Sequence, residues 1–370
     1  MEREELAAWL RLAMTPGVGR GSARKLLAAF GLPRNIFEQD AQALRAVVHA
    51  PQVQALRTEP EGWSGQVETT WAWLRQDRSR RLLTLADPAY PAALLQTEDP
   101  PLMLYVSGVA LAEWPRAVSV VGSRNPTPQG ANNAREFARS FAQAGWTVVS
   151  GMALGIDAAA HEGALEGASP GQVATIAVVG TGLDRVYPSQ HHQLAHRIAA
   201  QGLLVSEYPL GTHPLAENFP QRNRIIAALG QGTLVVEAAL RSGSLITARQ
   251  AAEQGRDVFA IPGSIHSPQA RGCHELLRQG AKLVETAHDV MEELAPAAPA
   301  KRSVPASAPA LASAESSLMQ ALGHDPVGLD ALIARTGESA AALQAQLLEL
   351  ELEGHVARLP GGLYQRLERG

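Results

Sequence analysis

Small and basic residues follow an apolar run near the middle of the chain. Gly122-Ser123-Arg124 comes directly after residues 117–121, which are typical of a buried strand. A glycine at the carboxyl end of a strand lets backbone amides turn toward an anion. The Ser123 hydroxyl can donate a hydrogen bond, and the Arg124 guanidinium adds fixed positive charge. This combination indicates a phosphate-binding turn, and the alternative is an ordinary strand-to-helix turn with a surface arginine.

Similar turns follow several later apolar stretches. Because the carboxyl ends of parallel strands meet at one edge of a sheet, we expect these turns to converge. They would form a groove of backbone amides and arginines that suits an extended polyanion such as DNA. The expected DNA- or phosphate-binding residues are Gly122, Ser123, Arg124, Ser150, Gly151, Arg185, Arg222, Asn223, Arg224, Ser242, Gly243 and Ser244.

Two arginines in this set have alternative roles. Arg222 and Arg224 flank Asn223 near the start of an expected helix, so their guanidinium groups need not point the same way. The planar fork of arginine pairs as well with a buried carboxylate as with a phosphate. One of the two could bind an anion while the other forms internal ion pairs.

The chain offers little for catalysis, metal binding or nucleotide binding. Asp157 and His161 could form an acid–base pair, but no nucleophile accompanies them, and Asp157 stands where a helix N-cap is needed. Arg185 stands where the dinucleotide motif G-x-G-x-x-G requires its third glycine. His191 and His192 are adjacent, and adjacent helical side chains point apart. We expect no catalytic residue, no metal site and no cofactor.

A second candidate for DNA contact lies near the N-terminus. A Pro-Gly-Val-Gly segment precedes an amphipathic stretch and resembles a helix-hairpin-helix turn, whose amides hold a DNA phosphate. The alternative is a helical turn used only for packing. The residues of this possible secondary contact are Gly17, Gly19, Arg20, Arg24 and Lys25.

Elements that would position the main groove alternate between strand and helix from residue 117 to about 294. Continuous apolar runs at 176–179 and 234–236 suit strands that are covered on both faces, as in parallel sheets. The pattern predicts an α/β fold with a Rossmann-like, doubly wound parallel sheet. Strands are expected at 117–121, 146–150, 173–179, 203–207, 233–237 and 258–261.

The remaining segments divide the chain into domains. Residues 1–80 are expected to form a helical domain, and 81–294 the Rossmann-like domain, in which 81–115 is a connector with one strand at most. The Ala/Pro/Ser-rich stretch 295–312 is typical of a linker, and 313–370 has the order of a winged helix-turn-helix. The third helix of that module contains no Lys or Arg but carries Glu349, Glu351 and Glu353. Phosphate would repel it, so we expect a protein contact or a structural role there.

The composition of the chain limits the kind of DNA site that it can form and the cell compartment that we expect. The chain has 370 residues, a formal net charge of −4, and only three lysines among its 32 basic side chains, so a DNA site must be a local cluster of arginines. The single cysteine, Cys273, excludes an internal disulfide. No apolar run approaches the ~20 residues of a membrane span, and no apolar signal segment follows Met1, so a cytoplasmic location is expected.

Together these motifs resemble the DNA-processing protein A family, also called DprA or Smf. The resemblance spans the whole α/β domain, and it rests on the order and spacing of several motifs. They are Gly122-Ser-Arg124, Ser150-Gly-Met-Ala-Leu-Gly-Ile-Asp157, Gly182-Leu-Asp-Arg-Val-Tyr-Pro188, Phe219-Pro-Gln-Arg-Asn-Arg-Ile-Ile226, Ser242-Gly-Ser-Leu-Ile-Thr-Ala248 and Ala260-Ile-Pro-Gly263.

The resemblance implies a function and a set of partners. Family members bind single-stranded DNA, protect incoming DNA in natural transformation and load the RecA recombinase, without enzymatic activity or a nucleotide. It also implies a sterile-alpha-motif-like helical domain, a DNA contact at Arg124, and a homodimer formed through the late α/β domain. Leu276 and Leu277 are candidates for that interface, although both could be core residues. Ser189 stands where members often carry a basic residue.

Two other functions remain as alternatives. One is a nucleotide-binding hydrolase related to the phosphoribohydrolases, but the stretch 242–251 lacks the double glycine and the glutamate of that group. The other is a transcription regulator that uses the winged helix, which the acidic third helix disfavours.

Overall fold

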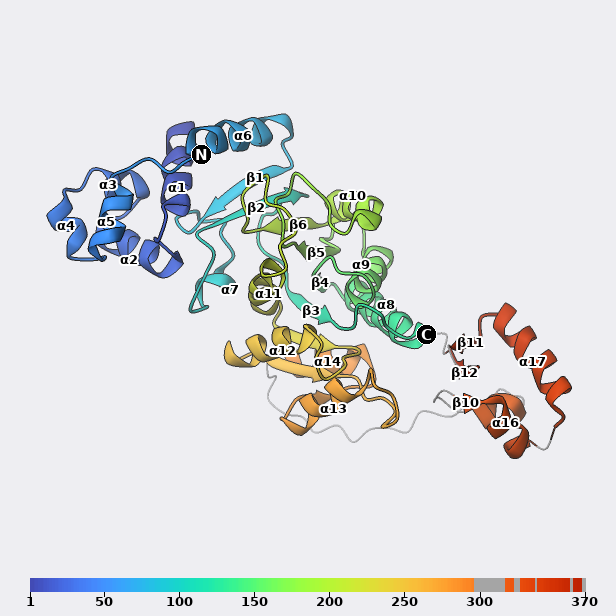
Figure 1. The fold of residues 1–370 in the computed structure, drawn as a ribbon. Coiled ribbons are helices and arrows are strands. Elements are labelled where there is room, and N and C mark those ends of the chain that lie inside the picture. The colour runs from blue at the N-terminus through green and yellow to red at the C-terminus, as the bar shows by residue number, and fades with distance from the viewer. Residues whose placement is uncertain (296–316, 323–326, 337, 360–361, 368–370) are drawn as a thin grey trace.

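The computed structural model describes residues 1–295, 317–322, 327–336, 338–359 and 362–367. Helices occupy the N-terminal part of the chain, and an α/β domain follows (Figure 1). The N-terminal helices are α1 (Arg3–Met14), α2 (Arg20–Phe30), α3 (Pro33–Phe37), α4 (Ala41–Arg45), α5 (Ala50–Leu56) and α6 (Trp63–Gln76).

The N-terminal helices share their core with the adjacent edge of the sheet. Leu6, Trp9 and Leu26 are fully buried among them, and Tyr105 of the sheet belongs to the same apolar cluster. The ring of Trp73 in α6 meets that of Tyr105 edge to face, with 5.9 Å between centroids. The helical domain is therefore seated on the α/β domain by packing.

A nine-stranded sheet forms the centre of the described structure, in the order β1-β2-β6-β5-β4-β3-β7-β8-β9. Strands β3 to β9 run parallel to one another, whereas β2 is antiparallel to both of its neighbours, β1 and β6. The strands are β1 (Arg80–Thr84), β2 (Met103–Gly108), β3 (Ala117–Val121), β4 (Thr147–Ser150), β5 (Thr175–Val178), β6 (Leu203–Ser206), β7 (Gly232–Val235), β8 (Asp257–Ala260) and β9 (Lys282–Leu283).

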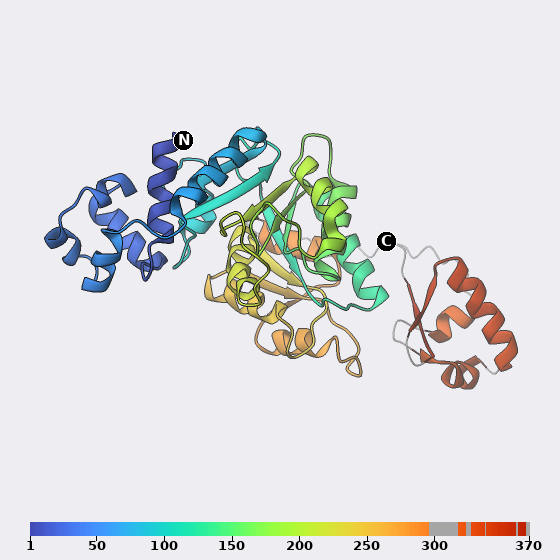
Figure 2. The same ribbon diagram turned by 45° about the horizontal axis from the view of Figure 1, so that its top comes forward.

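Helices cover both faces of this sheet (Figures 1 and 2). The helices of this domain are α7 (Ala92–Leu95), α8 (Pro128–Gln143), α9 (Ile156–Gly167), α10 (His192–Gln201), α11 (Asn218–Leu229), α12 (Ser244–Glu253), α13 (Arg271–Arg278) and α14 (Ala287–Leu294), with a 3-10 turn, η1 (Ser189–His191). Alternate residues of β3 face opposite sides of the sheet. Val118 and Val120 pack with α8, α9 and α14, whereas Ala117 and Val121 pack with α11, α12 and α13. The predicted doubly wound fold class is confirmed.

The strand order places the ligand-binding edge. From β3 the chain proceeds to β4, β5 and β6 on one side, and later to β7, β8 and β9 on the other. The crevice between β3 and β7, at their carboxyl ends, is therefore the topological switch point where such sheets bind ligands.

The segment 81–115 differs from the expected connector. It contains most of β1 and all of β2, which pair with each other and extend the sheet beyond β6. The prolines of this segment all lie between β1 and β2, except Pro115, which follows β2, so they do not interrupt either strand. This extension provides the surface on which α6 packs.

The C-terminal part forms a winged helix. Its elements are α15 (Ser317–Leu322), β10 (Val327–Gly328), α16 (Leu329–Thr336), α17 (Ala340–Leu352), β11 (Val356–Leu359) and β12 (Leu363–Arg366). Leu318, Leu332, Leu343 and Val356 form its core. Residues 296–312 of the expected linker, and the turn expected at Gly337, lie outside the described residues. In the described part of the chain, no helix has both the length and the apolar composition needed to cross a membrane.

Candidate nucleic-acid interface

A groove of about 710 Å³ lies at the switch point between β3 and β7. Its lining comes from the turn after β3, from α11 and from the turn that leads into α12. Of the residues expected to bind phosphate, Gly122, Ser123, Arg124, Arg222, Asn223, Ser242, Gly243 and Ser244 line it. The structure therefore brings the two expected turns, after β3 and before α12, together with the start of α11.

Close packing fixes the Gly122-Ser123-Arg124 turn. A Cβ on Gly122 would lie 2.7 Å from Cγ1 of Ile156, so no larger residue fits there. The Ser123 hydroxyl accepts a hydrogen bond from the Asn125 amide at 3.1 Å and lies 3.4 Å from Oε1 of Gln269. This hydroxyl therefore shapes the turn. Gln269, which the sequence did not indicate, also donates from Nε2 to the Asn125 carbonyl at 3.1 Å.

A carboxylate occupies the start of helix α8, immediately after this turn. Oε2 of Glu237 accepts from the Thr127 amide at 2.9 Å, and Oε1 accepts from the Thr127 hydroxyl at 2.6 Å. Burial raises the pKa of Glu237, while these hydrogen bonds lower it. Rossmann-like proteins that bind nucleotides place a phosphate at this helix N-terminus. Glu237 already supplies the anion here, which disfavours a nucleotide bound in that way.

Arg124 projects into the groove with its charge free. The side chain is exposed and has no hydrogen bond or ion pair with another described residue. Its Cζ lies 6.0 Å from the centroid of the Phe219 ring, which belongs to the first turn of α11. A guanidinium held near a ring face keeps its in-plane donors available to a phosphate.

Arg222 forms part of the floor of the groove. It is 5% exposed and donates to the Val178 carbonyl, beside Asp157, which is 7% exposed. A Cβ on Gly151 would lie 2.4 Å from Oδ2 of Asp157 and 2.7 Å from Nη1 of Arg222. Burial raises the pKa of Asp157 and lowers that of Arg222. Gly151 therefore leaves room for two buried opposite charges, and it does not itself line the groove.

Three polar residues of the groove lining come from α11 and from the start of α12: Asn223, Ser242 and Ser244. Asn223 is half-buried, and its amide has no hydrogen-bond partner among the described residues. The Ser242 and Ser244 hydroxyl oxygens are 2.7 Å apart, so one donates to the other. Gly243 between them is exposed, with open space where a Cβ would lie.

Arg241 is a groove residue that the sequence prediction did not include. It is exposed, lines the groove and has no ion pair or hydrogen bond with a described residue. The signal was its position directly before the Ser-Gly-Ser turn. Together with Arg124 it gives the groove two unpaired cations.

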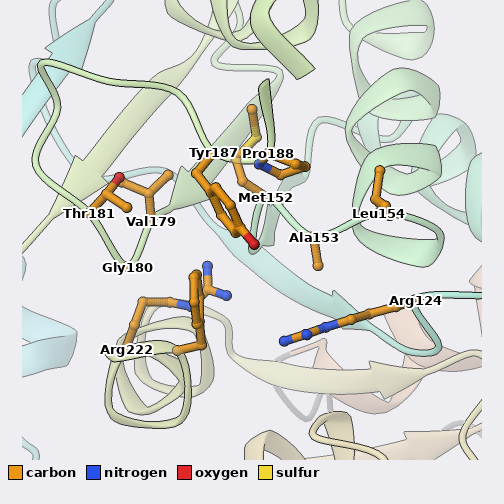
Figure 3. Close-up of a pocket in the computed structure, with 11 residues that line it drawn as sticks. Arg124, Met152, Ala153, Leu154, Val179, Gly180, Thr181, Tyr187, Pro188 and Arg222 are labelled. Carbon is orange, nitrogen blue, oxygen red and sulfur yellow. The ribbon is translucent and has the colours of Figure 1, made fainter. Parts of the chain in front are cut away.

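A smaller pocket of about 110 Å³ adjoins the groove and shares Arg124 and Arg222 with it (Figure 3). Its walls are mostly apolar, and Tyr187 and Phe219 contribute rings whose centroids are 5.6 Å apart. The Thr181 hydroxyl in its lining is buried and has no hydrogen-bond partner among the described residues. Trp146, another aromatic residue of this domain, is 1% exposed and belongs to the core.

Besides Gly151, three residues expected to bind phosphate do not face the groove. The Ser150 hydroxyl is fully buried and donates to the Val120 carbonyl at 2.6 Å, because it lies within β4. Arg185 is engaged with Asp184 at 3.0 Å and with Nδ1 of His213 at 2.8 Å. Arg224 lies on the other side of α11, where it ion-pairs with Glu207.

Asp157 and His161 both have structural roles, but Asp157 is not the helix N-cap that the sequence indicated. The N-cap of α9 is Gly155, and Asp157 stands in the first turn, where it accepts from the Ala153 amide at 3.2 Å. His161 is fully buried between the Gly151 carbonyl and the Thr175 hydroxyl. Burial lowers the pKa of His161 to about 4, so it is neutral at pH 7.

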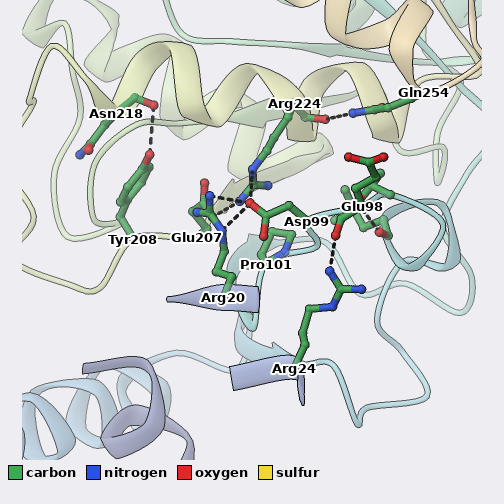
Figure 4. Close-up of polar contacts among 12 residues, drawn as sticks. Arg20, Arg24, Glu98, Asp99, Pro101, Glu207, Tyr208, Asn218, Arg224 and Gln254 are labelled. Carbon is green, nitrogen blue, oxygen red and sulfur yellow. Dashed lines mark hydrogen bonds and ion pairs between the residues drawn. The ribbon is translucent and has the colours of Figure 1, made fainter. Parts of the chain in front are cut away.

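Two basic residues of the N-terminal turn, Arg20 and Arg24, have internal partners. Nη2 of Arg20 lies 2.6 Å from Oδ2 of Asp99, and Arg24 donates to the Glu98 carbonyl (Figure 4). Both therefore hold the helical domain against the α/β domain. Lys25 is exposed, and a Cβ on Gly17 or Gly19 would meet open space.

Comparison with known proteins agrees with this architecture. A family model described as DNA recombination-mediator protein A matches residues 81–295. The chain belongs to that family. A second model, of the DprA winged helix domain, matches residues 302–362.

Individual members are similar over much of the chain. Protein Smf of Escherichia coli (strain K12) is 42% identical over 312 residues, covering 82% of this chain and 81% of that protein. An X-ray structure of DNA processing protein A from Streptococcus pneumoniae has a TM-score of 0.65 and 35% identity, covering 79% of this chain and 98% of that one. A structure of the Helicobacter pylori protein, which concerns its single-stranded DNA binding mode, has a TM-score of 0.52 and 33% identity, covering 58% and 95%.

The leucines considered for a dimer interface in this family member are turned inward. Leu276 is 8% exposed within the apolar core, and Leu277 packs against the same cluster, because α13 covers the sheet with this face. Ile265 and Leu283, in the same part of the domain, are 74% and 55% exposed. Ile265 lies in the segment after β8, and Leu283 is the second residue of β9.

Proposed function

We propose that this recombination-mediator family member binds single-stranded DNA in the switch-point groove and acts without catalysing a reaction itself. The observation that carries the proposal is the pair of unpaired cations, Arg124 and Arg241, on a groove built from two turns and helix α11. The structural relative from Helicobacter pylori, whose single-stranded DNA binding mode has been described, supports it. Phosphates would contact Arg124, Arg241 and the amides of the Gly122 and Gly243 turns.

The apolar pocket beside Arg124 supports a single strand over a duplex. Bases of a single strand are free to leave the stack and lie against aromatic side chains. Tyr187 and Phe219 offer such a surface next to the proposed phosphate contacts.

Hydrolysis of a nucleotide is the weaker alternative. Of the described residues that line the groove, only Asp157 is a carboxylate, and it is 7% exposed beside Arg222. General acid–base hydrolysis needs a carboxylate or imidazole within reach of the substrate. Glu237 is held by Thr127 at the α8 N-terminus, and His161 is fully buried.

Regulation of transcription through the winged helix is also less favoured. Helix α17 is the third helix of that module, the position from which such folds enter the major groove. It contains Glu349 and Glu351 but no Lys or Arg between Ala340 and Leu352. A protein partner suits this acidic helix better than DNA does.

The wider role follows from the family. We infer that the bound strand is protected and passed to a RecA-type recombinase, in natural transformation or in another recombination process of the cytoplasm. A homodimer would present two grooves to one strand and raise avidity without new contacts. In this chain its apolar contacts would come from Ile265 and Leu283, because Leu276 is buried and Leu277 is partly buried against the core.

The test compares the binding of labelled oligothymidine with that of a labelled duplex of equal length. Fluorescence anisotropy measures both affinities at several salt concentrations. The proposal predicts tight, salt-sensitive binding of the single strand and much weaker binding of the duplex. Equal binding of both would favour a double-strand binder. Absence of binding at low salt would contradict the proposal and direct attention to nucleotide hydrolysis.

A further inference from the structure

Four charged side chains join the helical domain to the α/β domain beside helix α11 (Figure 4). Arg20, the first residue of α2, lies with Nη2 2.6 Å from Oδ2 of Asp99 and with Nη1 3.2 Å from Oε2 of Glu207. Arg224 of α11 ion-pairs with the same oxygen of Glu207. One carboxylate is thus shared by an arginine from each domain.

The inner half of this network is buried. Glu207 is 7% exposed and Arg224 13%, whereas Arg20 and Asp99 are 33% and 40% exposed. Breaking a buried ion pair leaves an uncompensated charge, which is costly, whereas an exposed pair contributes little by itself. Arg20 and Asp99 therefore matter chiefly through what they hold in place, which is Glu207 and, through it, α11.

Helix α11 separates this network from the proposed DNA groove. Successive residues of a helix are turned by about 100°, and Arg222 and Asn223 line the groove while Arg224 reaches Glu207. The residue after Glu207 also holds this helix, because the Tyr208 hydroxyl donates to the carbonyl of Asn218, the first residue of α11, at 3.1 Å. A shift of the segment 207–208 would therefore move the groove wall.

We propose that Arg20, Asp99 and Glu207 are positioning residues for DNA binding. By docking the helical domain they hold α11 so that Asn223 and Phe219 face the bound strand. The inference rests on the proposed function, and it adds that the N-terminal helices set DNA affinity without touching DNA.

The variant Asp99→Asn separates this role from a direct contact by the sign of its effect. If Arg20 bound a phosphate, Asp99 would compete for its guanidinium, and removal of the carboxylate would raise DNA affinity. Loss of a negative charge near any DNA site would act in the same direction. Only a positioning role predicts that Asp99→Asn lowers affinity.

The experiment uses the full chain and labelled oligothymidine at constant salt. Arg20→Ala and Asp99→Asn should each weaken binding by roughly 3- to 10-fold, within the range of indirect coupling. Arg45→Ala is the matched control, since Arg45 is an exposed arginine of the same helical domain, at the end of α4 and outside the expected DNA-binding residues. It should leave affinity unchanged. Stronger or unchanged binding by Asp99→Asn, or a loss with Arg45→Ala, would overturn the inference.

A double-mutant cycle tests whether Arg20 influences DNA binding through α11. Because the effect of Arg20 passes through α11, Asn223→Ala should cost less affinity in the Arg20→Ala background than in the wild type. Strictly additive losses would contradict the inference. Wild type and Arg124→Ala are measured alongside: no binding by the wild type refutes the proposed function itself, whereas intact binding with additive losses refutes only this inference. If Arg20→Ala does not fold, the affinity of Asp99→Asn still tests the positioning role. The Asp99 side chain is 40% exposed, so this substitution should leave the fold intact.

Discussion

The guanidinium of Arg124 and the ring of Phe219 face each other across the groove, with 6.0 Å between Cζ and the ring centroid. Arg124 belongs to the turn after β3 and Phe219 to the first turn of α11. The pair therefore brings a phosphate-binding group and an apolar surface for a base into one site. This proximity of charge and ring distinguishes the groove from a simple anion site.

Replacement of Arg241 tests the extent of the groove. Arg241→Ala should weaken binding of oligothymidine and lower the slope of log affinity against log salt by about 0.7, because one phosphate contact to a single strand is lost. A titration at several salt concentrations measures both. Arg249→Ala is the control, since Arg249 is an exposed arginine of α12 outside the groove lining. Equal losses in the two variants would show that only overall charge matters.

Two glycines of the expected binding set should differ in their effect on folding. Gly151→Ala places a methyl group 2.4 Å from Asp157 and 2.7 Å from Arg222, and should lower the free energy of unfolding by about 1–3 kcal/mol. Gly243→Ala meets no atom within 4 Å and should change it by less than ~0.5 kcal/mol. Denaturant unfolding of both variants provides the comparison. A stable Gly151→Ala protein would mean that the buried charges have room to move.

The sequence predicted the fold class and the turns at Gly122 and Gly243, because both depend on local patterns. Apolar runs reveal buried parallel strands, and a glycine after a strand marks the turn. It could not tell Ser123 from Ser150, since both are serines at strand ends next to glycine. Only the strand boundary decides that Ser150 lies inside β4 and bonds to Val120.

Arginine roles were harder to predict for a related reason. Whether an arginine binds a ligand or an internal carboxylate depends on which acids the fold brings near it. Arg20 and Arg224 meet at Glu207, which lies far from Arg20 in the sequence. Arg241 was missed although it adjoins the Ser242 turn, because its freedom from any ion pair is visible only in the structure.

The buried His161 predicts a pH dependence of stability. Its pKa is about 4 in the folded protein, below its ordinary value of 6.5, so between these values the unfolded chain binds a proton that the folded chain does not. Stability is therefore fully present above pH 6.5 and falls as the pH is lowered toward 4, by roughly 2 kcal/mol between pH 7 and pH 5. Denaturant unfolding at both pH values should show a smaller fall for His161→Gln than for the wild type. An equal fall would assign the pH dependence to other groups.

A further prediction concerns self-association. If two copies meet through the late α/β domain, Leu283→Glu or Ile265→Asp should shift the molar mass seen by light scattering from dimer to monomer, because each buries a charge in an apolar contact. Leu348→Glu is a control, since Leu348 is an exposed leucine of α17. Loss of the dimer with the control alone would place the interface on the winged helix.

The most direct test of the account is the binding of labelled oligothymidine by the wild type and by Arg124→Ala across a salt series. Arg124 is exposed and unpaired, so the substitution should leave the fold intact. The account predicts tight, salt-sensitive binding by the wild type, several-fold weaker binding by the variant, and a shallower salt slope. Equal binding by the two proteins would contradict it and would move the DNA away from the switch-point groove.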